Sequence, residues 1–389
     1  MFPAPFAPLV STRRVGRPLR IAVIGTSRYP IRQPFAGGLE ALVWQLVGRL
    51  RSRGHDVTLF AGEGSDGVDG EFAEYAFPSR GWEPSRTAAG DQSMPERAFM
   101  SDHHAYLRLL MALAGPLADR FDVIHNHSLH HLPVAMAPLL ATPMLTTLHT
   151  PPTPWLESAI QAAPETTLGP GAFAAVSAFI AQQWRVLRPF AGPDVVANGV
   201  DLTSWVAGQG GQMLSWSGRI VPEKAPHLAI DAARKAGMPL VIAGPLSDLR
   251  YFEQAIRPRL GVDVRYAGHL AVPELAQLVG SSAAVLVTPL WDEPYGLVVA
   301  ESLACGTPVV AFDRGGIPEV VADSSLGALV PHGDVATMAA AVGDVVELDR
   351  VAVREHAERY LSVDRMVTKY EKAYQRLTST SSVGADLTA

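Results

Sequence analysis

The sequence predicts an α/β protein made of two doubly wound domains, each built on a parallel sheet. The chain has 389 residues, which is more than one hydrophobic core usually organises. Short apolar runs alternate with helical patterns almost from end to end, and this alternation is typical of doubly wound architecture. The pattern stops at a glycine-rich linker over residues 199–211 and then restarts. We therefore expect two Rossmann-like domains that face each other across a cleft.

The first domain is expected over residues 1–200. Helices are predicted over residues 38–53 and 96–119. Residues 62–95 are rich in Gly, Ser, Asp and Pro, which predicts an irregular surface insertion. The predicted strands are residues 20–24, 57–60, 122–124, 144–148, 172–176 and 194–197.

The second domain is expected over residues 201–362, with a helix over residues 223–235. Its predicted strands are residues 213–216, 240–243, 262–266, 284–287 and 308–311. Residues 363–389 are expected to form a helix that returns to the first domain, with its amphipathic part over residues 366–377. The Ser/Thr-rich tail beyond Thr378 is expected to be disordered.

Composition excludes several classes of protein. Hydrophobic residues make up 48% of the chain and charged residues 18%, which indicates a globular protein. A formal charge of −6 disfavours nucleic acid or an anionic membrane as the main partner, and no apolar run is long enough for a transmembrane segment. The single Cys305 excludes an intramolecular disulfide, and the proline-containing first ten residues do not resemble a signal peptide. We expect a cytoplasmic monomer or homodimer.

A long motif runs from Asp292 to Pro308, across a predicted strand-to-helix turn. Glu293 lies in the turn, where an acidic helix cap is the simplest explanation. Glu301 is the only charged residue of the predicted helix, among Leu, Val and Ala. A carboxylate there is costly unless a ligand or side chain hydrogen-bonds it, and sugar hydroxyls would satisfy both carboxylates. Gly296 allows backbone N–H groups to approach a phosphate at the helix start.

A second motif, residues 217–224, also joins a predicted strand to a helix. Arg219 and Lys224 would present two positive charges to a diphosphate. Lysine is rare in this chain, with four residues among 32 basic ones, so Lys224 is unusual as surface filler. A solvated helix start is the alternative, and we favour the anion site.

Three histidines follow predicted strands: His125, His127 and His149. Residues two apart on a strand share a face, so His125 and His127 are expected to lie together. A metal pair and a pair of hydrogen-bonded structural imidazoles are both open, although no Cys or carboxylate ligands accompany them. His130 and His131 are expected in an exposed loop.

These motifs resemble those of the GT-B glycosyltransferases of family 4, which carry a Glu-(seven residues)-Glu motif and a Gly-Arg…Lys pair. The resemblance covers most of the chain, including segments 37–38, 198–201, 243–245, 268–270 and 315–319. It implies that Glu301 holds the ribose and Glu293 holds sugar hydroxyls. It also implies that Arg219 and Lys224 bind the diphosphate, and that His127 lies near the donor sugar's hydroxymethyl group. The chain departs at Ala225, where the family often has a glycine, which we expect only to ease backbone approach.

The resemblance also implies a set of binding residues on both sides of the cleft. On the acceptor side, the expected lining comes from residues 62–104 and 149–157, with His125, His149, Thr150 and Trp155. The remaining donor-binding residues are expected to be Gly37, Gly38, His269, Leu270, Tyr295, Gly296, Leu297 and Val298.

The reaction implied by the family is a retaining transfer of a hexose or N-acetylhexosamine from a nucleotide-diphosphate sugar, expected to be a UDP-sugar, to a hydroxyl acceptor. No Asp-x-Asp motif occurs in the chain, so we expect no metal and no cofactor. A nucleotide-sugar epimerase and a non-catalytic sugar-nucleotide-binding protein are the alternatives. A dehydrogenase is disfavoured because residues 25–28 lack the G-x-G-x-x-G pattern.

Overall fold

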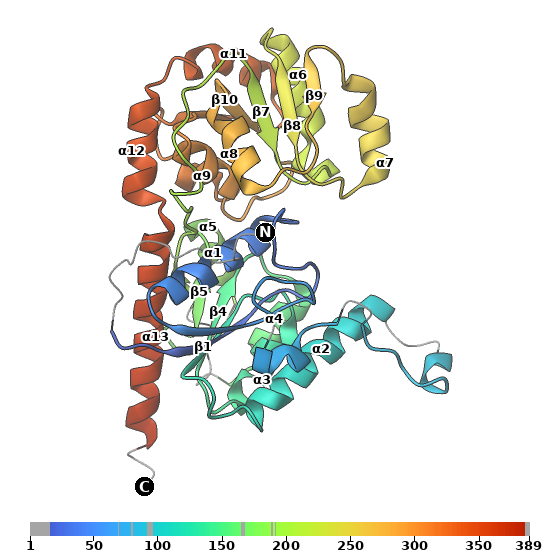
Figure 1. Ribbon diagram of the computed structural model, residues 1–389, viewed down its shortest axis with the longest axis vertical. Helices are drawn as coiled ribbons and strands as arrows, with labels where there is room; N and C mark the ends of the chain where they lie inside the picture. Colours follow the sequence, from blue (N-terminus) through green and yellow to red (C-terminus); the bar gives the residue numbers. More distant parts are fainter. Residues whose placement is uncertain are drawn as a thin grey trace.

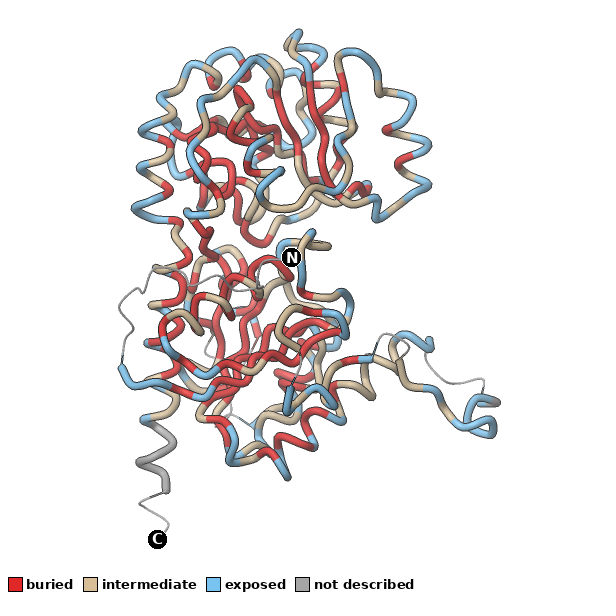
Figure 2. Tube along the Cα trace, in the orientation of Figure 1, coloured by how far each residue is buried: buried red, intermediate tan, exposed pale blue. Residues whose placement is uncertain are grey.

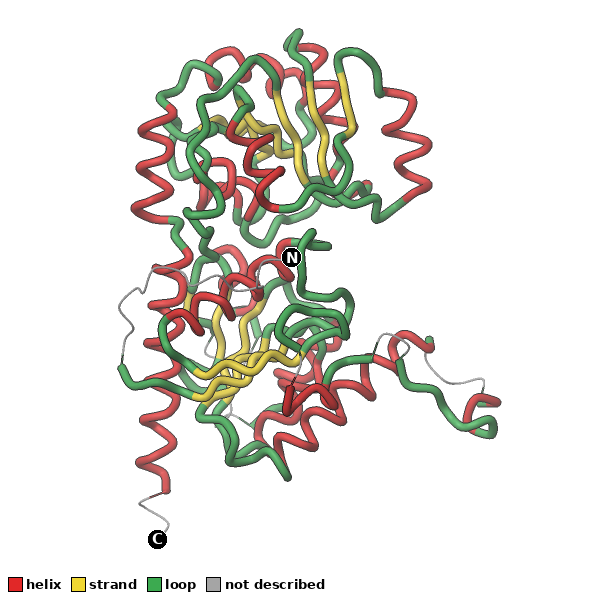
Figure 3. The backbone as a smooth tube through the Cα atoms, in the orientation of Figure 1, coloured by secondary structure: helices red, strands yellow, loops and turns green. Residues whose placement is uncertain are grey.

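The computed structural model describes residues 16–68, 70–78, 81–91, 96–164, 168–187, 190 and 192–385. The first ten residues, for which a signal peptide is not expected, lie outside these residues. Two lobes are stacked along the long axis, and the C-terminal helix runs from the second lobe down the side of the first (Figure 1). Each lobe has a parallel sheet at its centre (Figure 3). The predicted pair of Rossmann-like sheets facing across a cleft is confirmed.

Among the described residues, the first sheet has six parallel strands in the order β2-β1-β3-β4-β5-β6. The strand order reverses at β1, which creates the crevice where ligands of such sheets bind. The strands are β1 (Arg20–Ile24), β2 (Asp56–Phe60), β3 (Val123–Asn126), β4 (Met144–Leu148), β5 (Phe173–Ala175) and β6 (Asp194–Val195). The helices of this lobe are α1 (Gly38–Ser52), α2 (Arg97–Ala114), α3 (His131–Met136), α4 (Pro154–Ala162) and α5 (Ala178–Trp184).

The second sheet, also six-stranded within the described part of the chain, has the order β12-β11-β10-β7-β8-β9. Its strands are β7 (Leu214–Ser217), β8 (Leu240–Ala243), β9 (Val264–Tyr266), β10 (Ala284–Val287), β11 (Val309–Phe312) and β12 (Gly327–Val330). Its helices are α6 (Pro226–Lys235), α7 (Leu249–Tyr251), α8 (Val272–Gly280), α9 (Leu297–Ala304), α10 (Ile317–Val320), α11 (Val335–Val345) and α12 (Arg350–Tyr360), and α13 (Val363–Ala385) follows.

Strand β1 shows how the sequence pattern builds the first lobe. Ile21 and Val23 pack into the core formed with α1 and α13, whereas Ala22 and Ile24 pack into the core formed with α2. Successive side chains of a strand point to opposite faces, so a continuous apolar run buries the strand on both sides. Figure 2 shows the resulting concentration of buried residues in the two sheets.

Four predicted features need correction. Strand β12 was not predicted, because a short edge segment with Gly and Ala gives a weak strand signal. The helix expected from residue 223 begins at Pro226, after a 3₁₀ turn. Helix α2 ends at Ala114, before residue 119. The tail beyond Thr378 is not disordered at its start, because α13 continues to Ala385.

Helix α13 is held on the first lobe by a buried ionic network. The Arg53 guanidinium donates to the Glu371 carboxylate at 2.8 Å and to Asp364 at 2.8 Å. His55 contacts the other Glu371 oxygen through Nε2 at 3.1 Å. The side chains of Arg53, His55 and Glu371 are almost completely buried. A buried charge is tolerated only when it is paired and hydrogen-bonded, so this network specifies where α13 lies.

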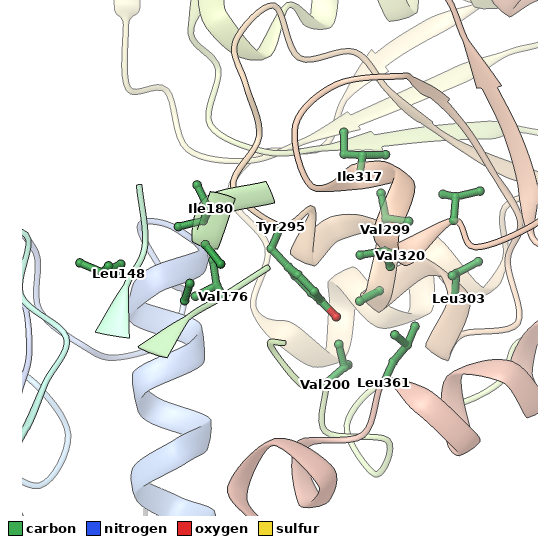
Figure 4. Close-up of a cluster of buried hydrophobic side chains, with 14 of the residues drawn as sticks. Leu148, Val176, Ile180, Val200, Tyr295, Val299, Leu303, Ile317, Val320 and Leu361 are labelled. Atoms are coloured by element: carbon green, nitrogen blue, oxygen red, sulfur yellow. The ribbon is translucent and has the colours of Figure 1, made fainter. Parts of the chain in front are cut away.

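The two lobes also share an apolar core. Tyr295, in the turn before α9, lies between Val176 and Ile180 of the first lobe and Val299 and Leu303 of the second (Figure 4). Its hydroxyl donates to the carbonyl oxygen of residue 198 at 2.8 Å. This shared packing holds the lobes at a defined distance around the cleft.

Candidate active site

A cavity of about 340 Å³ lies between the lobes, at the carboxyl ends of both sheets. This is the position where open α/β sheets bind ligands. The cavity is lined by most of the predicted site residues, namely Gly37, Gly38, His149, Thr150, Arg219, Lys224, His269, Leu270, Glu293, Tyr295, Gly296, Leu297, Val298 and Glu301. The structure therefore brings together residues that lie more than 250 positions apart in the sequence.

Glu301 projects from the second turn of α9 and is 9% exposed. Among the described residues no side chain or backbone group donates a hydrogen bond to its carboxylate, which lines the cavity. Desolvation raises the pKa of this carboxyl from 4.5 to about 8. A buried carboxylate without a partner is expensive, and a ligand that donates hydrogen bonds would satisfy it.

Lys224, Glu293 and Trp291 form a compact group on the same wall. The Lys224 ammonium forms an ion pair with Glu293 Oε2 and lies 4.8 Å from the centroid of the Trp291 ring. Trp291 Nε1 also donates to Glu293 Oε2, at 3.0 Å. Glu293 is thus oriented by two donors while it remains at the cavity surface, where it has acceptor capacity left for further hydroxyl groups.

The backbone conformation of Ala225 explains why a glycine is favoured at this position. It adopts a left-handed backbone conformation with φ 47° between the 3₁₀ turn Pro222–Lys224 and α6. That conformation costs a residue with a Cβ about 1 kcal/mol or more, whereas glycine adopts it freely. The expectation that a glycine would only ease backbone approach is therefore wrong, since the conformation of the turn is what favours it.

Gly244 and Gly296 shape the backbone of the cavity wall that also carries Arg219 and Lys224. A Cβ on Gly244 would lie 1.8 Å from the carbonyl oxygen of Gly218, so the turns after β7 and β8 can meet only without a side chain there. Gly296 has φ 93° and starts α9. The first N–H groups of a helix have no partner within the helix, and Leu297 and Val298 line the cavity. This helix start can bind an anionic oxygen.

Two charged residues at the cavity were not singled out from the sequence. Glu40 lies in the first turn of α1 and is 5% exposed. Burial raises the pKa of its carboxyl, and the positive charges of Arg219 and Arg28 oppose that shift. Arg28 lies in the loop after β1 and lines the cavity. An acidic residue two positions after the Gly37–Gly38 pair was the available signal.

Contacts across the cleft join the two lobes around the cavity. His269 Nε2 contacts the carbonyl oxygen of Phe35 at 2.9 Å, and the Val272 N–H donates to Gln33 at 3.1 Å. A Cβ on Gly38 would lie 3.5 Å from the Leu297 side chain. The loop before α1 therefore closes over the second lobe in this structure.

The histidines form a hydrogen-bonded chain that leads from the core to the cavity. His127 Nδ1 contacts His149 Nε2 at 2.9 Å, and His127 Nε2 contacts His125 Nδ1 at 3.2 Å. The expectation that His125 and His127 share a face of the strand is confirmed. Both are fully buried, and His149 reaches the cavity instead. Neither His125 nor His127 lines the cavity in this arrangement, so the expected contacts of His127 with the donor sugar and of His125 with the acceptor stay predictions.

Most of the other residues expected on the acceptor side do not line the cavity. Trp155 is 61% exposed at the start of α4 and packs against Phe99 and His131, away from the cavity lining. Of the described residues in segments 62–104 and 149–157, only His149 and Thr150 line the cavity. His130 and His131 do not form an exposed loop, because His130 caps α3 by accepting the N–H of residue 132. The positions of Trp155, His130 and His131 depend on tertiary packing, which local chemistry did not predict.

Within the described ranges, no group of three or more His, Cys, Asp or Glu side chains is arranged to hold a metal ion. In the same ranges, no helix is long and apolar enough to cross a membrane.

Comparisons with known proteins agree with this geometry. Residues 36–204 match the model of Glycosyltransferase Family 4, and residues 206–360 match that of glycosyl transferases group 1. Glycogen synthase of Mycobacterium tuberculosis is 29% identical over 372 residues, covering 86% of this chain and 88% of that protein. D-inositol 3-phosphate glycosyltransferase of Kribbella flavida is 29% identical over 430 residues, covering 94% and 98%.

The fold has solved relatives as well. The Anabaena protein HepE, in complex with UDP and glucose, shares it with a TM-score of 0.69 and 17% identity, over 92% of this chain and 100% of that one. Two Rossmann-like sheets facing a shared cavity define a GT-B protein. The chain belongs to the GT-B glycosyltransferases of family 4, and it is an enzyme that transfers a sugar from a donor to an acceptor.

Proposed function

We propose that this enzyme is a retaining, metal-independent transferase that moves a hexose or an N-acetylhexosamine from a UDP-sugar to a hydroxyl of a small molecule or glycan. One observation carries the proposal: a single cavity wall presents the unpartnered Glu301 carboxylate beside the cations Arg219 and Lys224. A nucleotide sugar is complementary to that wall, because its ribose hydroxyls donate and its diphosphate accepts. The presence of UDP and glucose in the HepE structure supports a uridine donor.

The proposed chemistry is mainly electrostatic. Arg219, Lys224 and the N–H groups at the start of α9 would stabilise the negative charge that grows on the departing diphosphate. These groups would serve where other transferases use a metal ion. Glu293 would hold the sugar hydroxyls. Because Lys224 and Trp291 already engage the Glu293 carboxylate, we propose that it is not a covalent nucleophile and that the acceptor attacks from the face of the leaving group.

Incubation with a panel of nucleotide sugars, without any acceptor, tests this proposal. We expect slow release of UDP from a UDP-sugar, together with a free sugar whose first-formed anomer keeps the donor's α-configuration, as seen by proton NMR. Release of an epimerised sugar would instead identify an epimerase. Tight binding of UDP-sugars with no turnover, even with a panel of hydroxyl acceptors, would identify a binding protein. Either result would overturn the proposal.

A further inference from the structure

Four aromatic rings, which we call the ring platform, lie at the amino-terminal ends of three helices of the first lobe. Phe99 and His103 belong to the first two turns of α2, His131 is the first residue of α3, and Trp155 is the second residue of α4. The three helices pack beside one another on the same side of the lobe (Figure 1). Helices that connect the strands of a parallel sheet begin at its carboxyl edge, where ligands bind. The ring platform therefore lies on the edge that forms the cavity, but outside the cavity lining.

The rings of the platform contact one another and leave one indole open. The centroid of the Trp155 ring is 5.2 Å from that of His131 and 5.4 Å from that of Phe99. The His131 ring is nearly parallel to Phe99, with an angle of 10° between them, and lies 6.1 Å from His103. Trp155 is nevertheless 61% exposed. Exposed apolar side chains that cluster, unlike scattered ones, mark binding surfaces.

Tyr106 and His130 connect the ring platform to the cavity. The Tyr106 hydroxyl accepts the N–H of Ser27, at 3.0 Å, in the loop after β1 that lines the cavity. The His130 ring stacks on Tyr106 at 4.7 Å and is 6.2 Å from the Phe99 ring. Leu129, the residue before His130, lines the cavity and is 43% exposed. A ligand that leaves the cavity over Leu129 therefore meets the ring platform.

The ring platform also presents polar groups at the edges of its rings. Within the described part of the chain, Trp155 Nε1 and the two ring nitrogens of His131 make no hydrogen bond, and none of these atoms is sealed from solvent. The indole N–H donates, whereas an imidazole can both donate and accept. Apolar ring faces with such polar edges are complementary to a pyranose ring, which has an apolar C–H face surrounded by hydroxyl groups.

The charges around the ring platform disfavour an anionic occupant. Asp102 of α2 and Glu157 of α4 are acidic, and each lies within two positions of a platform residue. Arg97, at the start of α2, is paired with Glu83 at 3.4 Å. Burial and a neighbouring histidine lower the pKa of His131 below its usual value, so this ring is neutral at physiological pH. A phosphorylated lipid or an anionic membrane would be repelled here, whereas a neutral sugar would not.

We propose that the ring platform is a remote subsite for a neutral sugar unit, and that the acceptor is an oligosaccharide that extends from the cavity over Leu129 to Trp155. This inference rests on the proposed function for the transfer reaction, but binding at the platform does not require turnover. The sugar that receives the new bond lies in the cavity, and a sugar further along the acceptor stacks on Trp155. Stacking on the exposed ring raises the affinity for long acceptors and leaves the reacting atoms untouched.

The subsite is tested with neutral oligosaccharides of glucose, mannose and N-acetylglucosamine, from one to six units long, as acceptors in the presence of a UDP-sugar. We expect the KM of the wild type to fall about tenfold with length in at least one series. Trp155→Ala should abolish this fall without changing kcat or the KM for the single sugar, and Trp155→Phe should retain most of it. Tyr360→Ala is the control, because Tyr360 is 51% exposed beside His356 on α12 of the second lobe. The control should behave as the wild type.

Calorimetric titration of the same oligosaccharides, with and without UDP, measures binding independently of turnover. If no series binds or reacts better with length, or if Trp155→Ala keeps the full length dependence, the inference is overturned. Binding to phosphatidylcholine vesicles, or a dimer, that is lost in Trp155→Ala in place of oligosaccharide binding would assign the surface to a membrane or to a second copy, and would also overturn it. Length-dependent binding through Trp155 in a wild type that turns over no UDP-sugar would instead contradict the proposed function and leave the subsite standing.

Discussion

Glu301 shows how one residue couples the stability of the fold to ligand binding. Its carboxyl has a pKa of about 8 in the folded protein, whereas an unfolded glutamate titrates near 4.5. Between these pH values the folded state binds more protons than the unfolded state, so the stability of the free enzyme falls as pH rises. Above pH 8 the whole cost of the buried charge is present. A ribose that donates two hydrogen bonds would recover part of that free energy.

The first prediction concerns Glu301→Gln. The amide keeps the shape but removes the charge-assisted hydrogen bonds, which contribute about 1.5–3 kcal/mol, so UDP affinity at pH 8 should fall roughly tenfold or more. The melting temperature of the free variant should equal or exceed that of the wild type at this pH. Wild-type affinity should rise from pH 6 to pH 8, and the variant's should not. Calorimetric titration measures the UDP affinities, and melting curves measure the stability of the free proteins. Lower stability of the variant with unchanged UDP affinity would make Glu301 a structural residue.

The second prediction concerns Arg219 and Lys224, the two cations of the proposed leaving-group site. Arg219→Ala and Lys224→Ala should each lower turnover by about two orders of magnitude, because each removes charge stabilisation from the transition state. Arg259→Ala is the control, since Arg259 lies outside the cavity lining in the same domain and is 3.8 Å from Asp231. Its turnover should not change. Full activity in a folded Arg219 or Lys224 variant would refute the assignment.

A third prediction follows from the proposal that side-chain cations take the place of a metal ion. Activity should survive extensive dialysis against EDTA, since in the proposed mechanism the cavity-lining Arg219 and Lys224 supply the positive charge that the diphosphate needs. Turnover is measured before and after chelation, and again after magnesium or manganese is added. Complete loss on chelation with recovery on addition of either ion would contradict the metal-independent mechanism.

At the scale of elements, sequence patterns predicted strands and helices well where local chemistry and tertiary packing agree. Strands β1 and β4 carry continuous apolar runs and lie where they were predicted. Glu301 could be singled out because a lone charge in an apolar helix has few explanations. The interruption at Ala225 between the 3₁₀ turn and α6 could not be predicted. A left-handed alanine is disfavoured locally, and only the surrounding fold imposes that conformation. The burial of His127 likewise depends on α13, which is more than 230 residues away in the sequence.

Helix α13 is the element whose position depends most on electrostatics. A fourth prediction is that Glu371→Gln lowers the free energy of unfolding by about 3 kcal/mol, because it leaves the buried Arg53 guanidinium short of negative charge. Arg376→Gln is the control on the same helix. It removes an ion pair with Asp194 whose side chains are both more than half exposed, so its effect should stay below about 1 kcal/mol. Urea unfolding measures both, and equal effects would contradict the role given to the buried network.

For the whole molecule, the sequence predicted two lobes and a shared cleft, but it could not predict how the lobes meet. That arrangement depends on contacts between distant segments, such as the Tyr295 ring packed between the lobes and the contact of His269 with the loop before α1. Glu293 and Glu301, which we propose to bind the donor, belong to the second lobe, whereas His149 belongs to the first. Nucleotide binding should therefore depend mainly on one lobe, and sugar transfer on the closed arrangement of both.

The final prediction separates these two steps. In Gly38→Leu, the new side chain would enter the space beside Leu297, since a Cβ at this position already lies 3.5 Å from that side chain. The lobes should be held apart, so turnover should fall at least a hundredfold while UDP affinity changes less than tenfold. Small-angle scattering should show a larger radius of gyration. Gly343→Leu in α11 is the control, because a Cβ there meets nothing within 4 Å. Equal losses of turnover and affinity in Gly38→Leu, without expansion, would show that the loop before α1 binds nucleotide directly and does not act through closure.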